Sequence, residues 1–292
     1  MRTYGFRSIR LPLLLAAALV ALAAWVTSLD AAPGAAQPPR APLRILLTND
    51  DGVRAPGILA VAQALKGMGE ITIAAPAENQ SGKGHSITTS DPIFVDTIKL
   101  PGDLPAFSLQ TTPASCVKVA VEALMAQKPD IVISGINRGY NLGMVTYVSG
   151  TVGAAREASL KGIPAIAASL SVEQTDYAPA AEIVRQVLVM ARKTPLEPGT
   201  FLNLNIPPGT AAAIKGIQLT RQSRLTGIER FEEQKSPGGR RLFWSVWNEP
   251  TGDAEGTDVW AVEHGFAAVT PLRAGEFDPA TLEKWKAALG LR

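Results

Sequence analysis

The sequence predicts an α/β protein whose mostly parallel sheet is covered by helices on both faces and is followed by antiparallel hairpins. Short runs rich in isoleucine and valine alternate along the chain with stretches of helical spacing. These runs are apolar throughout, as is typical of strands buried on both faces of a parallel sheet. The chain has 292 residues and a hydrophobic content of 46%, which is enough to bury a large core.

The expected elements of the core follow one another from Pro42 onward. Strands are predicted for LRILLT, EITIAAP, DIVISGI, PAIAAS and FLNLNIP, at residues 43–48, 70–76, 130–136, 164–169 and 201–207. Helices are predicted at residues 57–67, 114–127, 152–161 and 178–193. Such sheets bind ligands in the crevice at the carboxyl ends of their strands, so we expect a site in the loops there.

The pattern changes beyond Pro208. The segments GIQLTRQ, RRLFWSVW and WAVEHGFAAVTPL alternate or run as strands between glycine, proline and polar links, which predicts antiparallel hairpins. A last helix is expected at residues 279–289, with Asp278 as its N-cap, Pro279 at its first position and Gly290 after its end. We therefore expect one domain over residues 39–292, with a core at about 43–207 and a hairpin region at about 208–272.

The first 38 residues are predicted to be a signal peptide and a linker. Three arginines precede an uncharged apolar run from Leu11 to Leu29, and a stretch of small residues follows it. We expect export, in the first place to the periplasm. An uncleaved membrane anchor is the alternative, because the run is close to the threshold of roughly 18 residues for a spanning helix, and a cytoplasmic protein is the third option. Cys116 is the only cysteine of the sequence, so no internal disulfide is expected.

The charge balance argues against binding to a nucleic-acid duplex. The formal net charge is +2, but the first 36 residues carry three arginines and one aspartate, and the remainder of the chain is neutral. A protein that binds duplexes through their phosphates needs a clear excess of lysine and arginine. We therefore expect a small-molecule partner.

Four polar, glycine-rich loops are expected to converge at the carboxyl edge of the sheet: TNDDG, ENQSGKGHS, SGINRGYN and SGTVGAA. The first contains Asp50 and Asp51, and two adjacent carboxylates repel unless a cation lies between them. With Ser81 and Asn137 in the neighbouring loops, all the candidate ligands are oxygens, which indicates one hard divalent cation, Mg²⁺ or Mn²⁺. A solvated turn explains NDDG by itself, but the convergence of the loops favours the cation.

The fourth loop has features of an anion site. Ser149, Gly150 and Thr151 offer hydroxyls and helix-start amides that suit a phosphate, although a plain helix cap uses the same residues. A cation site and an anion site on one rim indicate phosphoryl chemistry, with hydrolysis of a phosphate ester as the simplest reaction.

Two other functions are alternatives. A phosphotransferase that forms an aspartyl-phosphate usually separates its aspartates by one residue, whereas Asp50 and Asp51 are adjacent. An exported, non-catalytic protein that binds a nucleotide or phosphate would need no metal, and adjacent carboxylates beside a phosphate would then be unfavourable.

Five segments, in order, resemble the SurE family of stationary-phase survival proteins, which are metal-dependent nucleotidases: ILLTNDDG, PAENQSGKGHSIT, PDIVISGINRGYNLG, SGTVGAAREA and GTDVWAVEHGFAAVTPL. The resemblance runs from about Leu43 to Leu272. It implies a Rossmann-like three-layer domain with C-terminal hairpins that mediate homodimers or homotetramers. It also implies hydrolysis of nucleoside 5′- and 3′-monophosphates, with polyphosphate or other esters as further substrates.

The resemblance assigns roles to residues of this chain. The ligands of one divalent cation per subunit fall on Asp50, Asp51, Ser81 and Asn137. Asp50 is our choice for the group that accepts a proton from the attacking water, with Asp51 as its catalytic partner. The phosphate oxygens are expected to be held by Gly82, Ser149, Gly150 and Thr151. His85 and Asn141 are candidate leaving-group contacts.

The chain departs from the family pattern at the rim of the expected site. Thr112 and Ser115 stand where members usually have a glycine and an aspartate, and MVTYV at residues 144–148 replaces an acidic residue and a tyrosine. These changes remove no predicted cation ligand but bear on substrate preference. In the hairpin region, the aromatic side chains are too dense for an isolated exposed hairpin and are expected to pack against a partner chain: Phe243, Trp244 and Trp247.

Overall fold

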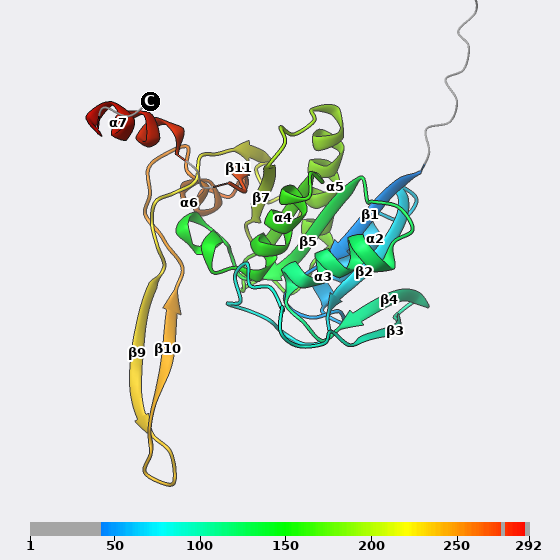
Figure 1. The fold of residues 1–292 in the computed structure, drawn as a ribbon, viewed down its shortest axis with the longest axis horizontal. Coiled ribbons are helices and arrows are strands. Elements are labelled where there is room, and N and C mark those ends of the chain that lie inside the picture. The colour runs from blue at the N-terminus through cyan, green and yellow to red at the C-terminus, as the bar shows by residue number, and fades with distance from the viewer. Residues whose placement is uncertain (1–41, 276–277, 290–292) are drawn as a thin grey trace, which may run out of the picture. The chain divides into compact units, whose positions relative to one another are not determined.

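A nine-stranded sheet carries the predicted site, and Figure 1 shows helices against it. The structure is a computed structural model that describes residues 42–275 and 278–289. The strands lie in the order β3-β4-β2-β1-β5-β6-β7-β11-β8. Their bounds are β1 (Leu43–Thr48), β2 (Gly69–Pro76), β3 (Val95–Leu100), β4 (Leu104–Leu109), β5 (Ile131–Arg138), β6 (Ala165–Leu170), β7 (Thr200–Ile206), β8 (Ile217–Leu219) and β11 (Ala267–Arg273). The neighbours from β4 to β7 are all parallel, which confirms the predicted mostly parallel sheet.

Helices cover both faces of this sheet and form three layers. The helices are α2 (Pro56–Ala64), α3 (Pro113–Val119), η1 (Ala120–Leu124), α4 (Gly150–Leu160) and α5 (Ala178–Lys193). Alternate side chains of β1 point to opposite faces. Ile45 and Leu47 pack in the core with α2 and α5, whereas Leu46 packs with α3 and α4. The apolar strands are therefore buried on both sides, as the sequence pattern predicts.

The chain reverses its direction of travel across the sheet at β1. From β1 it proceeds to β2 and β4 on one side, and it returns to β5, β6 and β7 on the other. The last residue of β1, Thr48, lies beside Ser134 of β5. Loops that leave two such neighbouring strands diverge and open a crevice at their carboxyl ends. Asp50 and Asp51 follow β1 directly at this point.

Two elements differ from the sequence-based expectation near the edges of the sheet. The antiparallel pair β3 and β4 was not predicted, because it is an edge hairpin whose side chains are largely exposed and carry no continuous apolar run. Its turn contains Gly102 and Asp103, which both have positive φ. The prediction of antiparallel hairpins was wrong for β8, which pairs in parallel with β11, while β11 is antiparallel to β7.

The expected strand at residues 260–272 begins as a helix instead. Helix α6 (Asp258–Glu263) includes Trp260 and is capped by Thr257, whose hydroxyl oxygen accepts the Trp260 N–H at 3.2 Å. Gly265, with a φ of 82°, follows the helix before β11 begins. The apolar residues of this segment therefore serve a helix first and a strand second.

The remaining C-terminal elements agree with the prediction. Strands β9 (Ile228–Lys235) and β10 (Arg241–Asn248) form a two-stranded antiparallel sheet of their own (Figure 1). Helix α7 (Pro279–Leu289) begins after Asp278, whose Oδ1 accepts the N–H groups of Ala280 and Thr281. Gly290 and the predicted leader lie outside the described residues. None of the helices in the described ranges is long and apolar enough to span a membrane.

Candidate active site

Asp50 is buried against the first turn of α4. Its side chain is 3% exposed. Its Oδ1 accepts the Thr151 hydroxyl at 2.5 Å. A Cβ added to Gly150 would stand 2.9 Å from Asp50 Oδ2, so only glycine lets the carboxylate lie this close to the helix. The end of β1 and the start of α4, far apart in sequence, therefore meet at one carboxylate.

Replacing Gly150 by alanine is expected to weaken cation binding, because the new methyl group must displace the Asp50 carboxylate. We expect the Kd for Mn²⁺ to rise by about tenfold, a typical cost of disturbing a group that positions a ligand. A titration followed by electron paramagnetic resonance measures this Kd. Gly238→Ala is the matched control, because a Cβ at Gly238 meets no atom within 4 Å. Equal Kd values for both variants and the unmodified protein would contradict the placement of Asp50.

Burial and repulsion disfavour negative charge on both aspartates. Burial raises the pKa of Asp50, and the hydrogen bond from Thr151 and the backbone N–H groups of Thr151 and Gly150 oppose this only in part. Burial, and then the charge of Asp50, raise the pKa of Asp51 to about 6, against the opposing N–H of Arg138, which donates to Asp51 Oδ2 at 3.1 Å. A cation between the two carboxylates would relieve both effects.

Cation binding is expected to weaken as the pH falls through the pKa of Asp51. Since that pKa is about 6, the carboxyl group is mostly ionised at pH 7 and mostly protonated at pH 5. A proton and a cation compete for the same oxygens, so the Kd for Mn²⁺ should be about tenfold higher at pH 5 than at pH 7. The same titration at the two pH values tests this, and the Asp51→Asn variant should lose most of the difference. A Kd that is constant between pH 5 and pH 7 would argue against cation binding by Asp51.

The other two predicted cation ligands come from loops that are hydrogen-bonded to the aspartates. Gln80 donates its N–H to the Asp50 carbonyl at 2.7 Å, and Ser81 follows it in the chain. Asn137 lies next to Arg138 at the end of β5, and its amide nitrogen donates to the Gly139 carbonyl at 2.8 Å. The amide oxygen of Asn137 is then the atom suited to a cation.

The donor set fits a hard divalent cation. It consists of two carboxylates, a hydroxyl and an amide oxygen, with no sulfur or imidazole. Within the described ranges no group of three or more histidine, cysteine, aspartate or glutamate side chains forms a metal cluster. The candidate site therefore depends on a carboxylate pair supplemented by neutral oxygens, which is the combination that the sequence predicts.

The start of α4 is already satisfied by protein groups. Ser149 caps the helix, with its Oγ accepting the Val152 N–H at 3.1 Å, and the amides of Gly150 and Thr151 act on Asp50. The Thr151 hydroxyl donates its only proton to Asp50. Phosphate binding by Gly150 and Thr151 stays a prediction that requires Asp50 to move. The Ser149 hydroxyl keeps its proton, and Gly82 lies in an exposed turn with a φ of 75°.

Figure 1 shows α4 beside β5, and one face of this helix also holds His85. Gly153, one turn after Gly150, lies so close to the preceding loop that an added Cβ would stand 2.2 Å from the Gly84 carbonyl oxygen. His85 Nε2 is 3.0 Å from Glu157 Oε2, and Lys118 Nζ is 3.3 Å from Glu157 Oε1. Burial acts to raise the pKa of Glu157, but the hydrogen bonds from His85 and Lys118 outweigh it and hold that pKa below its ordinary value. Glu157 is therefore an anion that orients the histidine.

Sequence reasoning missed Glu157 and Lys118 as partners of His85. A signal was present, because Gly150, Gly153 and Glu157 recur at intervals of three and four residues and so share one helix face. What the sequence did not contain was the identity of the loop that packs on this face.

The structure places Asn141 in a buried cluster of amides. Its side-chain nitrogen donates to Ser169 Oγ at 2.8 Å, and its backbone N–H donates to Asn205 Oδ1 at 2.8 Å. Its backbone carbonyl accepts from Asn203 and Asn205. Asn141 thus ties the loop after β5 to β6 and β7, and contact with a leaving group stays a prediction for it.

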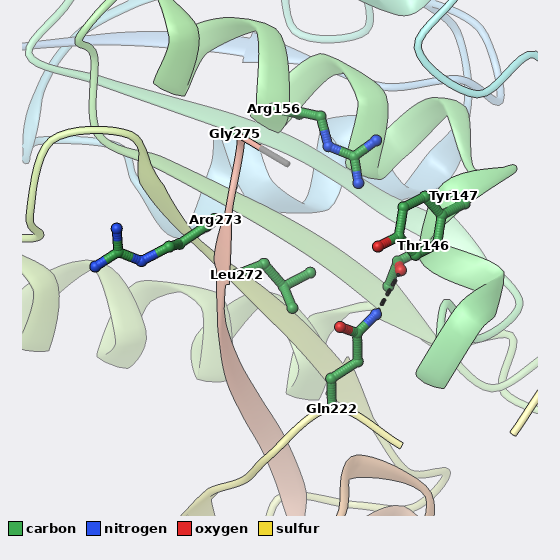
Figure 2. Close-up of a pocket in the computed structure, with 7 residues that line it drawn as sticks. All are labelled: Thr146, Tyr147, Arg156, Gln222, Leu272, Arg273 and Gly275. Carbon is green, nitrogen blue, oxygen red and sulfur yellow. Dashed lines mark hydrogen bonds between the residues drawn. The ribbon is translucent and has the colours of Figure 1, made fainter. Parts of the chain in front are cut away.

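Figure 2 shows a cavity of about 360 Å³ between η2 (Gly143–Tyr147), α4 and the end of β11. Gln222 reaches the Thr146 hydroxyl there at 2.9 Å, and Arg273 points away from Arg156. The Arg156 guanidinium lies 5.4 Å from the centroid of the Tyr147 ring. None of the predicted site residues lines this cavity. A second cavity, of about 430 Å³, lies at the carboxyl ends of β2 and β4.

Comparison with known proteins identifies the family. The family described as "Survival protein SurE" matches residues 45–228. A protein of Syntrophobacter fumaroxidans named 5′-nucleotidase SurE is 40% identical over 232 residues, which cover 79% of this chain and 93% of that protein. One of the same name from Syntrophomonas wolfei is 41% identical over 249 residues, covering 84% and 94%. The crystal structure of the SurE protein from Aquifex aeolicus superposes with a TM-score of 0.72 at 36% identity, covering 84% of this chain and 99% of that one. The chain belongs to the SurE family.

Proposed function

We propose that this protein is a divalent-cation-dependent phosphomonoesterase that hydrolyses nucleoside 5′- and 3′-monophosphates to nucleoside and phosphate. The observation that carries the proposal is the Asp50–Asp51 pair, which is held at the end of β1 against the start of α4 and in which both pKa values are raised. The names of the relatives as 5′-nucleotidases support nucleotides as the substrate class.

Asp50, Asp51, Ser81 and Asn137 would hold one cation, Mg²⁺ or Mn²⁺, per subunit. When bound, such a cation supplies Lewis-acid polarisation of the phosphoryl group. Asp50 accepts a proton from the water that attacks phosphorus, while the Thr151 hydroxyl keeps the Asp50 carboxylate oriented. The Ser149 hydroxyl and the Gly82 amide donate to the phosphate oxygens.

His85 completes the reaction at the leaving group. As the bond between phosphorus and the ester oxygen breaks and the bond to the water oxygen forms, the departing alkoxide needs a proton. His85 supplies it, and the buried Glu157 carboxylate holds the ring in place at 3.0 Å. This role is supported by the packing of the Gly84–His85 loop on Gly153, one helical turn from the contact between Gly150 and Asp50.

Phosphate release by the purified protein tests the proposal. The substrates are nucleoside 5′- and 3′-monophosphates, p-nitrophenyl phosphate and tripolyphosphate, each assayed with EDTA and then with added Mg²⁺ or Mn²⁺. Release that requires the cation is the expected result, and the ranking of substrates shows whether nucleotides, polyphosphate or other esters are preferred. Absence of release with every cation would favour a non-catalytic nucleotide-binding or phosphate-binding protein.

We also propose a homodimer or homotetramer assembled through the β9–β10 hairpin. Phe243, Trp244 and Trp247 are 54%, 60% and 43% exposed, an unusual density of aromatic surface for a two-stranded sheet. Light scattering coupled to gel filtration should give a multiple of the 30.8 kDa chain mass. A monomer at micromolar concentration would contradict this assembly.

Export to the periplasm is proposed from the basic and apolar start of the sequence alone. Fractionation of cells, with detection of a C-terminal tag, distinguishes a periplasmic protein from a membrane-anchored or cytoplasmic one. The mass of the recovered protein shows whether the leader has been cleaved.

A further inference from the structure

The cavity at the carboxyl ends of β2 and β4 adjoins the carboxylate pair. Gln80, one of its lining residues, donates its N–H to the Asp50 carbonyl at 2.7 Å. Glu78, another, packs on Gly52, where an added Cβ would stand 3.4 Å from the Glu78 carbonyl carbon. Gly52 itself has a φ of 105°, a conformation that favours glycine, and it directly follows Asp51. The wall of the cavity and the backbone that positions the two aspartates are thus in direct contact.

The lining of this cavity suits a neutral group with several hydroxyls. It offers the Glu78 carboxylate and the amides of Gln80 and Gln110, with the apolar Leu109 also part of the lining, and it includes no lysine or arginine. A carboxylate there would repel a phosphate but binds sugar hydroxyls well, as acidic residues do in dinucleotide sites. The volume of about 430 Å³ lies within the range of small-molecule sites.

The threonines of the cavity are committed to holding its wall. The Thr111 hydroxyl donates to Thr88 Oγ1 at 2.7 Å, and the Thr112 hydroxyl lies 2.6 Å from the Ser86 carbonyl oxygen. Thr88 in turn donates its N–H to Ser115 Oγ at 2.8 Å. Glu78 and Gln110 are exposed and face no such constraint on their orientation. The wall is built with Thr112 and Ser115, two residues at which this chain departs from the usual family pattern.

We infer that this cavity binds the sugar of the leaving nucleoside, with Glu78 accepting hydrogen bonds from the ribose hydroxyls and Gln110 donating to the same group. The inference rests on the proposed function and adds to it the residues that select the leaving group. Phosphate stays at the carboxylate pair, and the nucleoside extends from there towards β2 and β4.

Steady-state kinetics of Glu78→Gln with Mn²⁺ test the inference. The substrates are adenosine 5′-monophosphate, its 2′-deoxy analogue and p-nitrophenyl phosphate, which has no sugar. We expect the KM for adenosine 5′-monophosphate to rise about tenfold, as for loss of a hydrogen bond to a charged group, with kcat retained. The preference for the ribo over the deoxy substrate should fall, and hydrolysis of p-nitrophenyl phosphate should be unchanged. Gln110→Ala should act in the same direction with a smaller effect.

Glu70→Gln is the matched control, because Glu70 is an exposed carboxylate at the opposite end of β2. An unchanged KM and ribo preference in Glu78→Gln, or an equal loss with p-nitrophenyl phosphate, would overturn the inference while leaving the phosphatase proposal intact. If the unmodified protein releases no phosphate from any ester, the phosphatase proposal fails, and calorimetric titration with adenosine then decides separately. Adenosine binding that Glu78→Gln weakens would retain the sugar site, and no binding would overturn it.

Discussion

Replacing Asp51 by alanine is expected to reduce cation-dependent phosphate release to background and to leave the protein folded. Asp51 contributes a carboxylate oxygen to the proposed cation site, and neutral ligands alone bind Mg²⁺ or Mn²⁺ poorly. Phosphate release with Mn²⁺ and the Kd for Mn²⁺ are the two measurements. Both should change, because the variant loses the cation before it loses the chemistry.

Stability separates this effect from misfolding. The folded-state pKa of Asp51 is raised from 3.8 to about 6, so the folded protein binds this proton more tightly than the unfolded chain does. Ionisation of Asp51 therefore costs stability as the pH rises from about 4 to above 6, and the cost persists at pH 7. The alanine variant lacks this cost, so without added cation it should melt no lower than the unmodified protein. Asp96→Ala, at an exposed carboxylate on β3, is the control. Normal turnover by Asp51→Ala would disprove the site assignment.

The cation site was predictable because each of its residues follows a strong local signal. Asp50 and Asp51 end an apolar strand, and Asn137 ends another. Parallel strands place their carboxyl ends at one edge, so strand assignment alone brought these loops together. The edge hairpin β3–β4 lacked such a signal, because its strands are exposed and lack an apolar run.

The occupancy of the α4 start could not be predicted in the same way. Free amides at a helix start suggest a phosphate site, but Asp50 already uses them, together with a threonine that lies 101 residues further along the chain. Only the close approach allowed by Gly150 makes this contact. A glycine at a helix start is consistent with capping, with anion binding or with close packing, and the partner decides among these.

The pairing of His85 with Glu157 had the same obstacle. The sequence separation is 72 residues, and the contact depends on Gly153, which lets the Gly84–His85 loop lie on α4. A loop histidine next to glycines is usually exposed, so its environment was decided by the helix rather than by its neighbours in sequence.

Replacing His85 by alanine is expected to lower kcat by about 100-fold for nucleoside monophosphates, the low end of the usual contribution of general acid catalysis. The effect should be much smaller for p-nitrophenyl phosphate, because nitrophenolate leaves without a proton. His264→Ala is the matched control, since the only other histidine of the chain lies on the exposed side of α6, stacked on Trp260. Equal losses for both classes of ester would show that His85 acts on structure and not on the leaving group.

Glu157→Gln tests whether the carboxylate acts through His85. The glutamine keeps the size of the side chain but removes the charge that contacts both His85 and Lys118. We expect a smaller loss of kcat than in His85→Ala, again confined to nucleotides, and no further loss when Glu157→Gln is added to His85→Ala. This pattern differs from that of Glu78→Gln, which changes KM and ribose preference instead of kcat. Additive losses in the double variant would mean that Glu157 supports the site independently of the histidine, for example by holding α3 and α4 together through Lys118.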